Sequence, residues 1–365
     1  MENYKRMVIK IGSSSLTDRQ GLLDESRMSA LTKAIAKLVQ EGWQPILVSS
    51  GAVAAGLGHL GWSRAHLTMP ERQAAASVGQ GLLMEKYNEL FSKQHLHVGQ
   101  ILLTKEDLAD RKRYLNARNT LNVLLDREIL PIVNENDTVA FAEIRFGDND
   151  TLSALVAGLV DAELLIILTD IDGLYSGDPR KDPTAELIPV VQQIDESILQ
   201  TAGGSGSPVG TGGMRTKLAA ARIAARSGLR TVVASGQDPS IIQTIAAGEQ
   251  VGTSFEPSAK VLKSRKQWIA FNSIARGTLL IDQGAVQAIT TDNKSLLAVG
   301  VKQVKGNFPT GSVVSVVDEK GTELAKGITS LSAADLRLII DKPRRGLEVI
   351  NRDWLVCERS WLTCQ

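Results

Sequence analysis

The sequence predicts an α/β protein in which helices cover both faces of a mostly parallel sheet, followed by a smaller β-rich domain. Apolar runs of strand length alternate with longer segments of helical periodicity up to about residue 255. The run at 164–168, Leu-Leu-Ile-Ile-Leu, is apolar at every position, which is typical of a strand buried on both faces. The length of 365 residues suits two domains.

The first domain, expected at 1–255, is a three-layer αβα sandwich. Each expected strand is a short run rich in Val, Ile and Leu, and these runs lie at 7–11, 45–48, 98–103, 130–133, 164–168 and 231–234. Helical periodicity between the strands predicts helices at about 26–40, 70–93, 111–125, 152–159, 213–227 and 240–247. Connections of helical length between strands predict parallel pairing.

A second domain is expected at 277–365, after a polar and basic linker at 256–276. Short apolar runs in this part of the chain are separated by glycines, which indicates strands joined by tight turns. These strands are expected at 279–281, 298–304, 313–317 and 324–328.

Composition excludes several classes of protein. Lys and Arg total 41 against 40 Asp and Glu, so no overall charge attracts nucleic acid or an acidic membrane. The two cysteines, Cys357 and Cys364, argue against a disulfide framework and predict a reducing compartment, the cytoplasm. The apolar segment at 152–168 is interrupted by Asp161 and Glu163, and the N-terminal segment has no signal-peptide pattern, so neither a membrane span nor export is expected.

Several nucleotide and hydrolase motifs are absent or misplaced. There is no G-x-x-x-x-G-K-[ST] sequence, which excludes the common P-loop. Residues 56–61 match G-x-G-x-x-G, but they begin six residues after the strand that ends near Ser50 and lack the acidic partner about 20 residues on, so a dinucleotide site is not expected. The four histidines show neither zinc-site spacing nor the pattern of a Ser-His-Asp triad.

Small and polar clusters occur where expected strands end or helices begin. Ligands of open α/β sheets bind outside the carboxyl ends of the strands, so these clusters should converge in space. Lys10 to Ser15 forms the first, which is either a ligand site or an ordinary turn after a strand-edge lysine. Ser49 to Gly56 opens a helix of small residues, which serves anion binding at the helix start or tight helix packing.

The third cluster is acidic and lies at 134–137 and 146–150, at the end of one strand and before the next helix. Neighbouring carboxylates repel each other unless a cation offsets them, which favours a metal ion or a substrate amino group over a solvated loop. The fourth cluster, at 168–175, contains Asp172-Gly173, for which a simple turn is the alternative to a ligand site.

The fifth cluster is the glycine-rich stretch at 203–213, which runs into a helix containing Lys217. Glycines let backbone N–H groups approach the oxygens of a phosphate, and the lysine adds a positive charge. A phosphate site is favoured here over a flexible linker, because the glycines lead directly into an amphipathic helix.

Together these clusters resemble the motifs of the amino acid kinase family. The resemblance rests on the residues at 8–14, 48–52, 100–104, 116–120, 133–137, 146–150 and 210–217. It extends over the full length, because 277 to about 353 is similar to the PUA domain that many bacterial members carry at their C-terminus.

The resemblance implies that the protein transfers phosphate from ATP, with Mg²⁺, to the side-chain carboxylate of L-glutamate. That reaction gives L-glutamyl 5-phosphate in the first step of proline biosynthesis, and proline is expected as a feedback inhibitor of a homo-oligomeric enzyme, a dimer or tetramer. The implied catalytic residues are Lys10, Asp150 and Lys217. No residue is implied as a direct metal ligand.

The resemblance also implies two binding sites. The substrate-binding residues are Ser50, Gly51, Asn134, Asp137, Asp148 and Asn149, with Asp137 paired to the α-ammonium group. The ATP-binding residues are Lys10, Gly12, Thr169, Asp170, Thr211, Gly212, Gly213, Met214, Arg215, Thr216 and Lys217.

Two alternatives stay open. The first is a member of the same family that acts on another small acid. The second is an RNA-binding protein that acts through the PUA domain, although 11 Lys and Arg against 10 Asp and Glu at 277–365 give that region almost no net charge.

Overall fold

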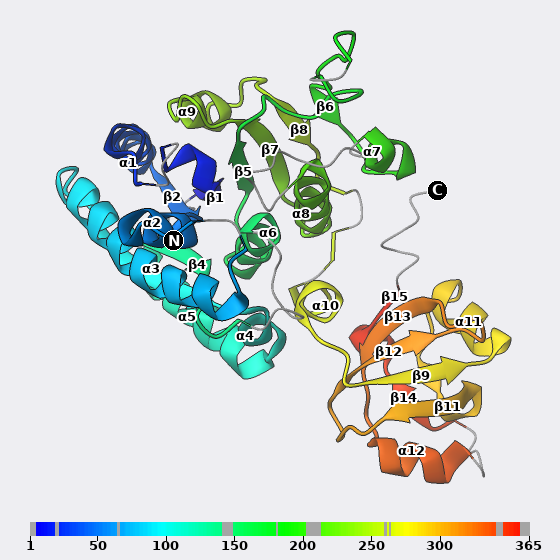
Figure 1. The fold of residues 1–365 in the computed structure, drawn as a ribbon. Coiled ribbons are helices and arrows are strands. Elements are labelled where there is room, and N and C mark those ends of the chain that lie inside the picture. The colour runs from blue at the N-terminus through cyan, green and yellow to red at the C-terminus, as the bar shows by residue number, and fades with distance from the viewer. Residues whose placement is uncertain are drawn as a thin grey trace. The chain divides into compact units, whose positions relative to one another are not determined.

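The computed structural model describes residues 5–18, 22–63, 66–140, 149–179, 182–201, 213–258, 261–262, 264–340 and 346–357. The chain divides into two compact units, Met1–Val261 and Leu262–Gln365 (Figure 1). No helix in the part of the chain that the structure describes has both the length and the apolar character needed to cross a bilayer.

An eight-stranded sheet forms the centre of the first unit, in the order β3-β4-β2-β1-β5-β7-β8-β6. Every pairing is parallel except the one between β7 and β8. The strands are β1 (Lys5–Ile11), β2 (Trp43–Ser49), β3 (His97–Leu103), β4 (Ile129–Glu135), β5 (Leu164–Thr169), β6 (Val190–Val191), β7 (Arg230–Ser235) and β8 (Thr253–Phe255). The six expected strands are present, and β6 and β8 are short additions at one edge.

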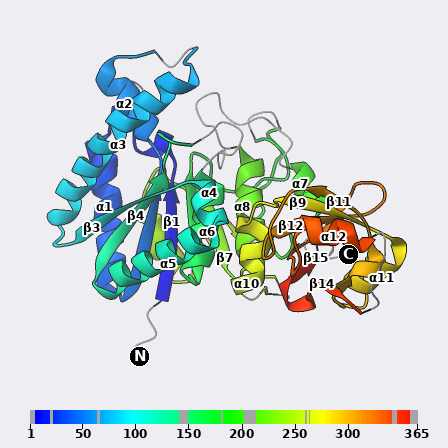
Figure 2. The same cartoon turned by 90° about the horizontal axis from the view of Figure 1, so that it is seen from below.

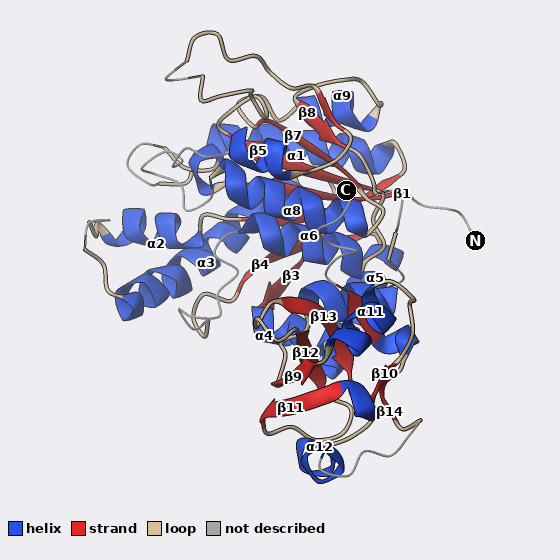
Figure 3. Cartoon of the chain, turned by 90° about the vertical axis from the view of Figure 1, so that its right-hand side faces the viewer, coloured by secondary structure: helices blue, strands red, loops and turns tan. Residues whose placement is uncertain are grey.

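Helices cover both faces of this sheet, as Figure 3 shows. The helices of this unit are α1 (Glu25–Gln40), α2 (Ala52–Leu60), α3 (Met69–Ser92), α4 (Lys105–Ala109), α5 (Arg111–Asp126), α6 (Asn149–Leu159), α7 (Glu196–Thr201), α8 (Met214–Arg226) and α9 (Ile241–Ala246). Met7, Ile9 and Ile11 of β1 share one hydrophobic core with α1, α3 and α9. Side chains alternate along a strand, so Val8 and Lys10 point to the opposite face, where α5, α6 and α8 pack. The three-layer αβα prediction is confirmed.

Helices α2 and α3 pack against each other at backbone distance and extend beyond the end of the sheet (Figure 2). A Cβ atom added to Gly56 would lie 1.9 Å from the carbonyl oxygen of Ala75, and one added to Gly79 would lie 1.8 Å from that of Ala52. Gly56 therefore serves helix packing. Helix packing therefore accounts for the first glycine of the G-x-G-x-x-G letters.

Gly79→Ala is expected to destabilise the first unit by about 2–3 kcal/mol, because the new methyl group must push two backbones apart. Gly81→Ala on the same helix is the matched control. A Cβ at Gly81 meets nothing within 4 Å, so that change should stabilise the helix by up to about 1 kcal/mol. Urea unfolding of both variants measures the difference, and equal unfolding midpoints would contradict the packing argument.

The second unit is built on a five-stranded sheet in the order β11-β9-β12-β13-β15 and a pair β10-β14. Its elements are α10 (Ser264–Gln267), β9 (Gly277–Ile281), α11 (Gln283–Thr290), β10 (Leu296–Leu297), β11 (Val301–Gly306), β12 (Val313–Val317), β13 (Glu323–Ile328), α12 (Ala333–Ile340), β14 (Glu348–Ile350) and β15 (Leu355–Cys357). One feature differs from expectation: residues 298–300 form a 3₁₀ turn ahead of β11 rather than part of a strand. In the segment expected as a linker, Trp268–Asn272 form a π-helical turn in which Trp268, Ile269 and Ala270 are buried.

Candidate active site

Two lysines converge on the carboxylate of Asp150. The Nζ atom of Lys10 lies 2.6 Å from Oδ1 of Asp150, and the Nζ atom of Lys217 lies 3.3 Å from Oδ2. The hydroxyl of Thr216 donates a 2.9 Å hydrogen bond to the same Oδ2. Lys10 comes from the central strand β1, Asp150 from the first turn of α6, and Thr216 and Lys217 from the first turn of α8. Three segments that are far apart in the sequence therefore meet at the carboxyl end of the sheet.

This lysine–aspartate group is buried. Asp150 is 0% exposed, Lys10 7% and Lys217 4%. Burial raises the pKa of Asp150, but the charges of Lys10 and Lys217 and the hydrogen bonds from Lys10 and Thr216 together outweigh it, so the pKa lies below its usual value. Asp150 is thus ionised at neutral pH. Two ammonium groups held at one carboxylate, in surroundings that exclude water, suit the site to interact with an anion such as a phosphoryl group.

A chain of side-chain amides adjoins the lysine–aspartate group. Nδ2 of Asn149 donates to Oγ of Ser50 at 2.9 Å, to Oδ1 of Asn134 at 2.8 Å and to the carbonyl of Ser49 at 3.2 Å. Nδ2 of Asn134 in turn donates to Oε1 of Gln80 at 2.8 Å. Because Asn149 directly precedes Asp150, the amide chain and the lysine–aspartate group meet at the start of α6.

Two helices begin at this edge without a side-chain cap. Gly51 precedes α2 with φ 109°, a left-handed conformation that favours glycine, and Gly213 precedes α8. The first backbone N–H groups of a helix have no partner within the helix, so uncapped N-termini are suited to bind anions.

The other predicted site residues that the structure describes also lie at the carboxyl ends of the strands, directly after them, or at the start of α8. Gly12 directly follows β1, and Thr169 ends β5 and donates to Oδ1 of Asp170 at 3.0 Å. Asp137 is half-buried in the turn after β4. Asp148, Thr211 and Gly212 lie outside the described residues, whereas Met214 and Arg215 open α8.

Gln80 was not among the residues predicted from the sequence. It lies in the middle of α3, where a polar residue is ordinary, and no spacing distinguishes it from the other polar residues of that helix. Its contact with Asn134 depends on how α3 packs across the end of β4, which only the structure reveals.

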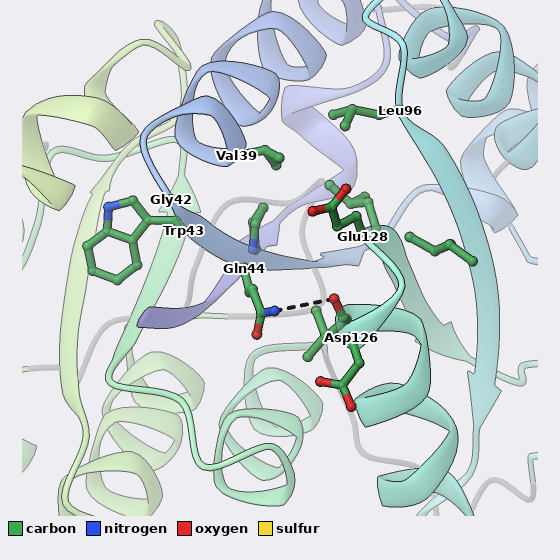
Figure 4. Close-up of a pocket in the computed structure, with 11 residues that line it drawn as sticks. Val39, Gly42, Trp43, Gln44, Leu96, Asp126 and Glu128 are labelled. Atoms are coloured by element: carbon green, nitrogen blue, oxygen red, sulfur yellow. Dashed lines mark hydrogen bonds between the residues drawn. The ribbon is translucent and has the colours of Figure 1, made fainter. Parts of the chain in front are cut away.

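A separate cavity of about 190 Å³ lies at the amino-terminal ends of the strands, opposite the carboxyl ends that carry the candidate active site (Figure 4). It is lined by residues at the starts of β2 and β4, including Trp43, Gln44 and Ile129. The Gln44 side chain donates to the carbonyl of Leu125 there at 3.3 Å. None of the predicted site residues lines this cavity, so it is not part of the candidate active site.

Comparison with known proteins identifies the family of the chain. Residues 5–235 match the model of the amino acid kinase family, and residues 277–350 match the PUA domain. The chain therefore belongs to the amino acid kinase family.

Among its relatives, the glutamate 5-kinase of Pseudomonas putida strain GB-1 is 49% identical over 346 residues, which is 95% of this chain and 93% of that protein. The glutamate 5-kinase of Nitrosospira multiformis is 47% identical over 348 residues, 95% of this chain and 94% of that protein.

Two solved structures share the fold of the first unit. The UMP kinase of Bacillus anthracis aligns with a TM-score of 0.51 at 18% identity, covering 71% of this chain and 99% of that one. A carbamate kinase from Giardia lamblia bound to AMP-PNP aligns with a TM-score of 0.54 at 17% identity, covering 71% of this chain and 100% of that one.

Proposed function

We propose that this protein transfers the γ-phosphoryl group of ATP to the side-chain carboxylate of L-glutamate, producing L-glutamyl 5-phosphate and ADP. The observation that carries the proposal is the buried group of Lys10, Asp150 and Lys217 at the carboxyl edge of the sheet. Relatives named glutamate 5-kinase that match 95% of the chain support glutamate as the acceptor and the first step of proline biosynthesis as the setting.

The chemistry needs positioning more than proton transfer. A side-chain carboxylate with a pKa near 4.3 is already ionised at neutral pH, so the nucleophile needs no general base. A bond forms between a carboxylate oxygen and the γ-phosphorus as the bond from that phosphorus to the leaving oxygen of ADP breaks. Lys10 and Lys217 stabilise the negative charge on the transferring oxygens, and Asp150 holds both ammonium groups in place.

Magnesium fits this site as part of the MgATP substrate. No group of three His, Cys, Asp or Glu side chains suited to a metal ion occurs among the described residues, and the carboxylate of Asp150 is taken up by two lysines. Mg²⁺ commonly keeps several waters and binds through substrate phosphates, where it offsets their charge.

We assign the L-glutamate subsite to the amide chain and its neighbours, and the ATP subsite to the lysine–aspartate group and the start of α8. L-Glutamate lies against Ser50, Gly51, Asn134, Asp137, Asp148 and Asn149. ATP lies against Lys10, Gly12, Thr169, Asp170 and 211–217. The glycine at the start of α8 and the uncapped N–H groups after it support a phosphate position there.

The remaining parts of the proposal concern organisation and regulation. Residues 1–255 form the catalytic domain, 256–276 connect the domains, and 277–365 form the PUA domain with its tail. The enzyme acts in the cytoplasm, which its low cysteine content favours. It forms a homo-oligomer and is inhibited by proline.

A hydroxylamine trap tests the reaction directly, because hydroxylamine converts an acyl phosphate into a coloured hydroxamate. Purified protein with MgATP is given L-glutamate, N-acetyl-L-glutamate or L-aspartate in parallel. Hydroxamate from L-glutamate alone, suppressed by proline, is the expected result. Enzyme that binds ATP but forms no hydroxamate from any acid would refute acyl phosphate chemistry.

Asp137→Ala is expected to raise the KM for L-glutamate by about 10- to 100-fold while the KM for ATP changes less than about threefold. Removal of the carboxylate leaves the substrate α-ammonium group without its charged partner, and such a contact contributes about 1.5–3 kcal/mol. Steady-state kinetics with each substrate varied in turn measures both constants. Equal increases in the two KM values would contradict the placement of glutamate beside Asp137.

A further inference from the structure

The amide chain fixes the orientation of each of its side chains. The backbone N–H of Glu135 donates to Oδ1 of Asn134 at 2.9 Å, and a backbone N–H is always a donor. Oδ1 of Asn134 is thereby identified as the acceptor, and Nδ2 must be the atom that faces Gln80. The atom of Gln80 that receives this hydrogen bond, at 2.8 Å, must then be Oε1. The orientation of Gln80 follows from hydrogen bonding alone.

The same logic leaves Nε2 of Gln80 as a free donor. This nitrogen is buried and has no hydrogen-bond partner among the described residues. A buried polar group left unpaired is costly, by an amount comparable to the gain from a hydrogen bond to a charged acceptor. A ligand that carries an acceptor would remove that cost on binding.

Gln80 lies between the two segments that carry the proposed glutamate site. Its neighbour Gly79 touches the backbone of Ala52, two residues after Ser50. Gln73, earlier on the same face of α3, donates to the carbonyl of Ala140 at 3.2 Å, three residues after Asp137. The free nitrogen of Gln80 is therefore held near the start of α2 and the turn after β4.

The substrate has one group that suits this donor. The γ-carboxylate of L-glutamate must face the lysine–aspartate group, and the α-ammonium group is assigned to Asp137. The α-carboxylate then remains, and it needs hydrogen-bond donors. We propose that Gln80 is a specificity residue of the glutamate site, with Oε1 orienting Asn134 and Nε2 donating to an α-carboxylate oxygen. This inference rests on the proposed function and extends it.

The test compares L-glutamate with 4-aminobutyrate, which keeps the reacting carboxylate and the amino group but lacks the α-carboxylate. Gln80→Glu is the main variant, because it is nearly isosteric and keeps an acceptor for Asn134 while replacing the donor with an anionic oxygen. At about pH 8, where an ordinary glutamate is ionised, kcat/KM for L-glutamate should fall by about 10- to 100-fold or more. The inhibition constant of 4-aminobutyrate against L-glutamate should change less than about threefold, because the lost contact contributes nothing to its binding.

Gln80→Leu provides a second variant without the added charge, and Gln243→Met is the matched control. Gln243 is also a half-buried helical glutamine, whose Nε2 donates to the carbonyl of Ala34 at 2.8 Å, on α9 and away from the site. The control should keep wild-type kinetics. Loss of affinity for both L-glutamate and 4-aminobutyrate by the same factor in both Gln80 variants would overturn the proposal and leave Gln80 a purely structural role. Unchanged kinetics would overturn it as well, whereas wild-type enzyme inactive on L-glutamate would refute the proposed function itself.

Discussion

Asp150→Asn is expected to lower kcat by about 10³-fold, the largest effect of any single substitution in this site. The substitution keeps the shape of the side chain but removes the charge that holds Lys10 and Lys217 at 2.6 Å and 3.3 Å. Without it, two buried ammonium groups repel each other and turn away from the transferring phosphoryl group. The KM for ATP should change little, because the added net positive charge still attracts the triphosphate.

The same variant should be less stable in the absence of ATP, by about 3–5 kcal/mol, because breaking a buried ion pair leaves uncompensated charge. MgATP should restore part of that loss, since its phosphates supply the missing anion. Asp161→Asn is the control: Asp161 pairs with Arg118, and its side chain is 55% exposed, so its removal should cost less than about 1 kcal/mol. Wild-type kcat in Asp150→Asn would exclude this carboxylate from the catalytic arrangement.

The sign of the Asp150 pKa shift sets the pH range for these assays. A carboxylate whose pKa is lowered in the folded protein contributes stability that is fully present above its unfolded pKa, near 3.9. That contribution is lost as the pH falls through the folded pKa. Between about pH 6 and 9 Asp150 therefore keeps its charge, and differences between variants in that range do not reflect its titration.

The positions of Lys10, Asp150 and Lys217 were predictable because they follow from topology. Parallel strands place their carboxyl ends together, so a lysine near the end of β1 and residues at the starts of α6 and α8 must approach one edge. Topology alone does not define how the side chains pair. The single carboxylate shared by two lysines depends on the register of three elements, which spacing along the chain does not define.

The features that the sequence did not reveal all depend on packing between distant segments. Gln80 and Asn134 are 54 positions apart and meet because α3 crosses the end of β4. Gly56 is part of a sequence that matches the dinucleotide-binding motif, yet a glycine is needed there because any side chain would clash with the backbone of α3. Trp268 lies in a segment whose basic residues suggest a linker, while its apolar neighbours are buried in the second unit. Local sequence shows which residue types are present, whereas each of these features depends on which distant segment the residue packs against.

Lys217→Ala is expected to lower kcat and kcat/KM by about the same factor, about 10²- to 10³-fold, while both KM values stay near those of the wild type. A contact that strengthens only as charge develops on the transferring oxygens acts on the transition state and not on ground-state binding. The hydroxamate assay under saturating MgATP and L-glutamate measures the change. Lys86→Ala is the control, because Lys86 pairs with Glu25 and Glu89 on the helices α1 and α3 and should leave kcat unchanged.

Stability separates the roles of the lysine and the aspartate. Loss of the Lys217 ammonium group leaves Asp150 paired with Lys10 at 2.6 Å, so no buried charge loses its only opposite charge. Lys217→Ala should therefore unfold at a higher temperature than Asp150→Asn, although both lose most of their kcat. If the two variants lost stability equally, the catalytic defect of Lys217→Ala would be attributable to disruption of the fold. An intact fold with a large loss of kcat instead assigns the Lys217 charge to phosphoryl transfer.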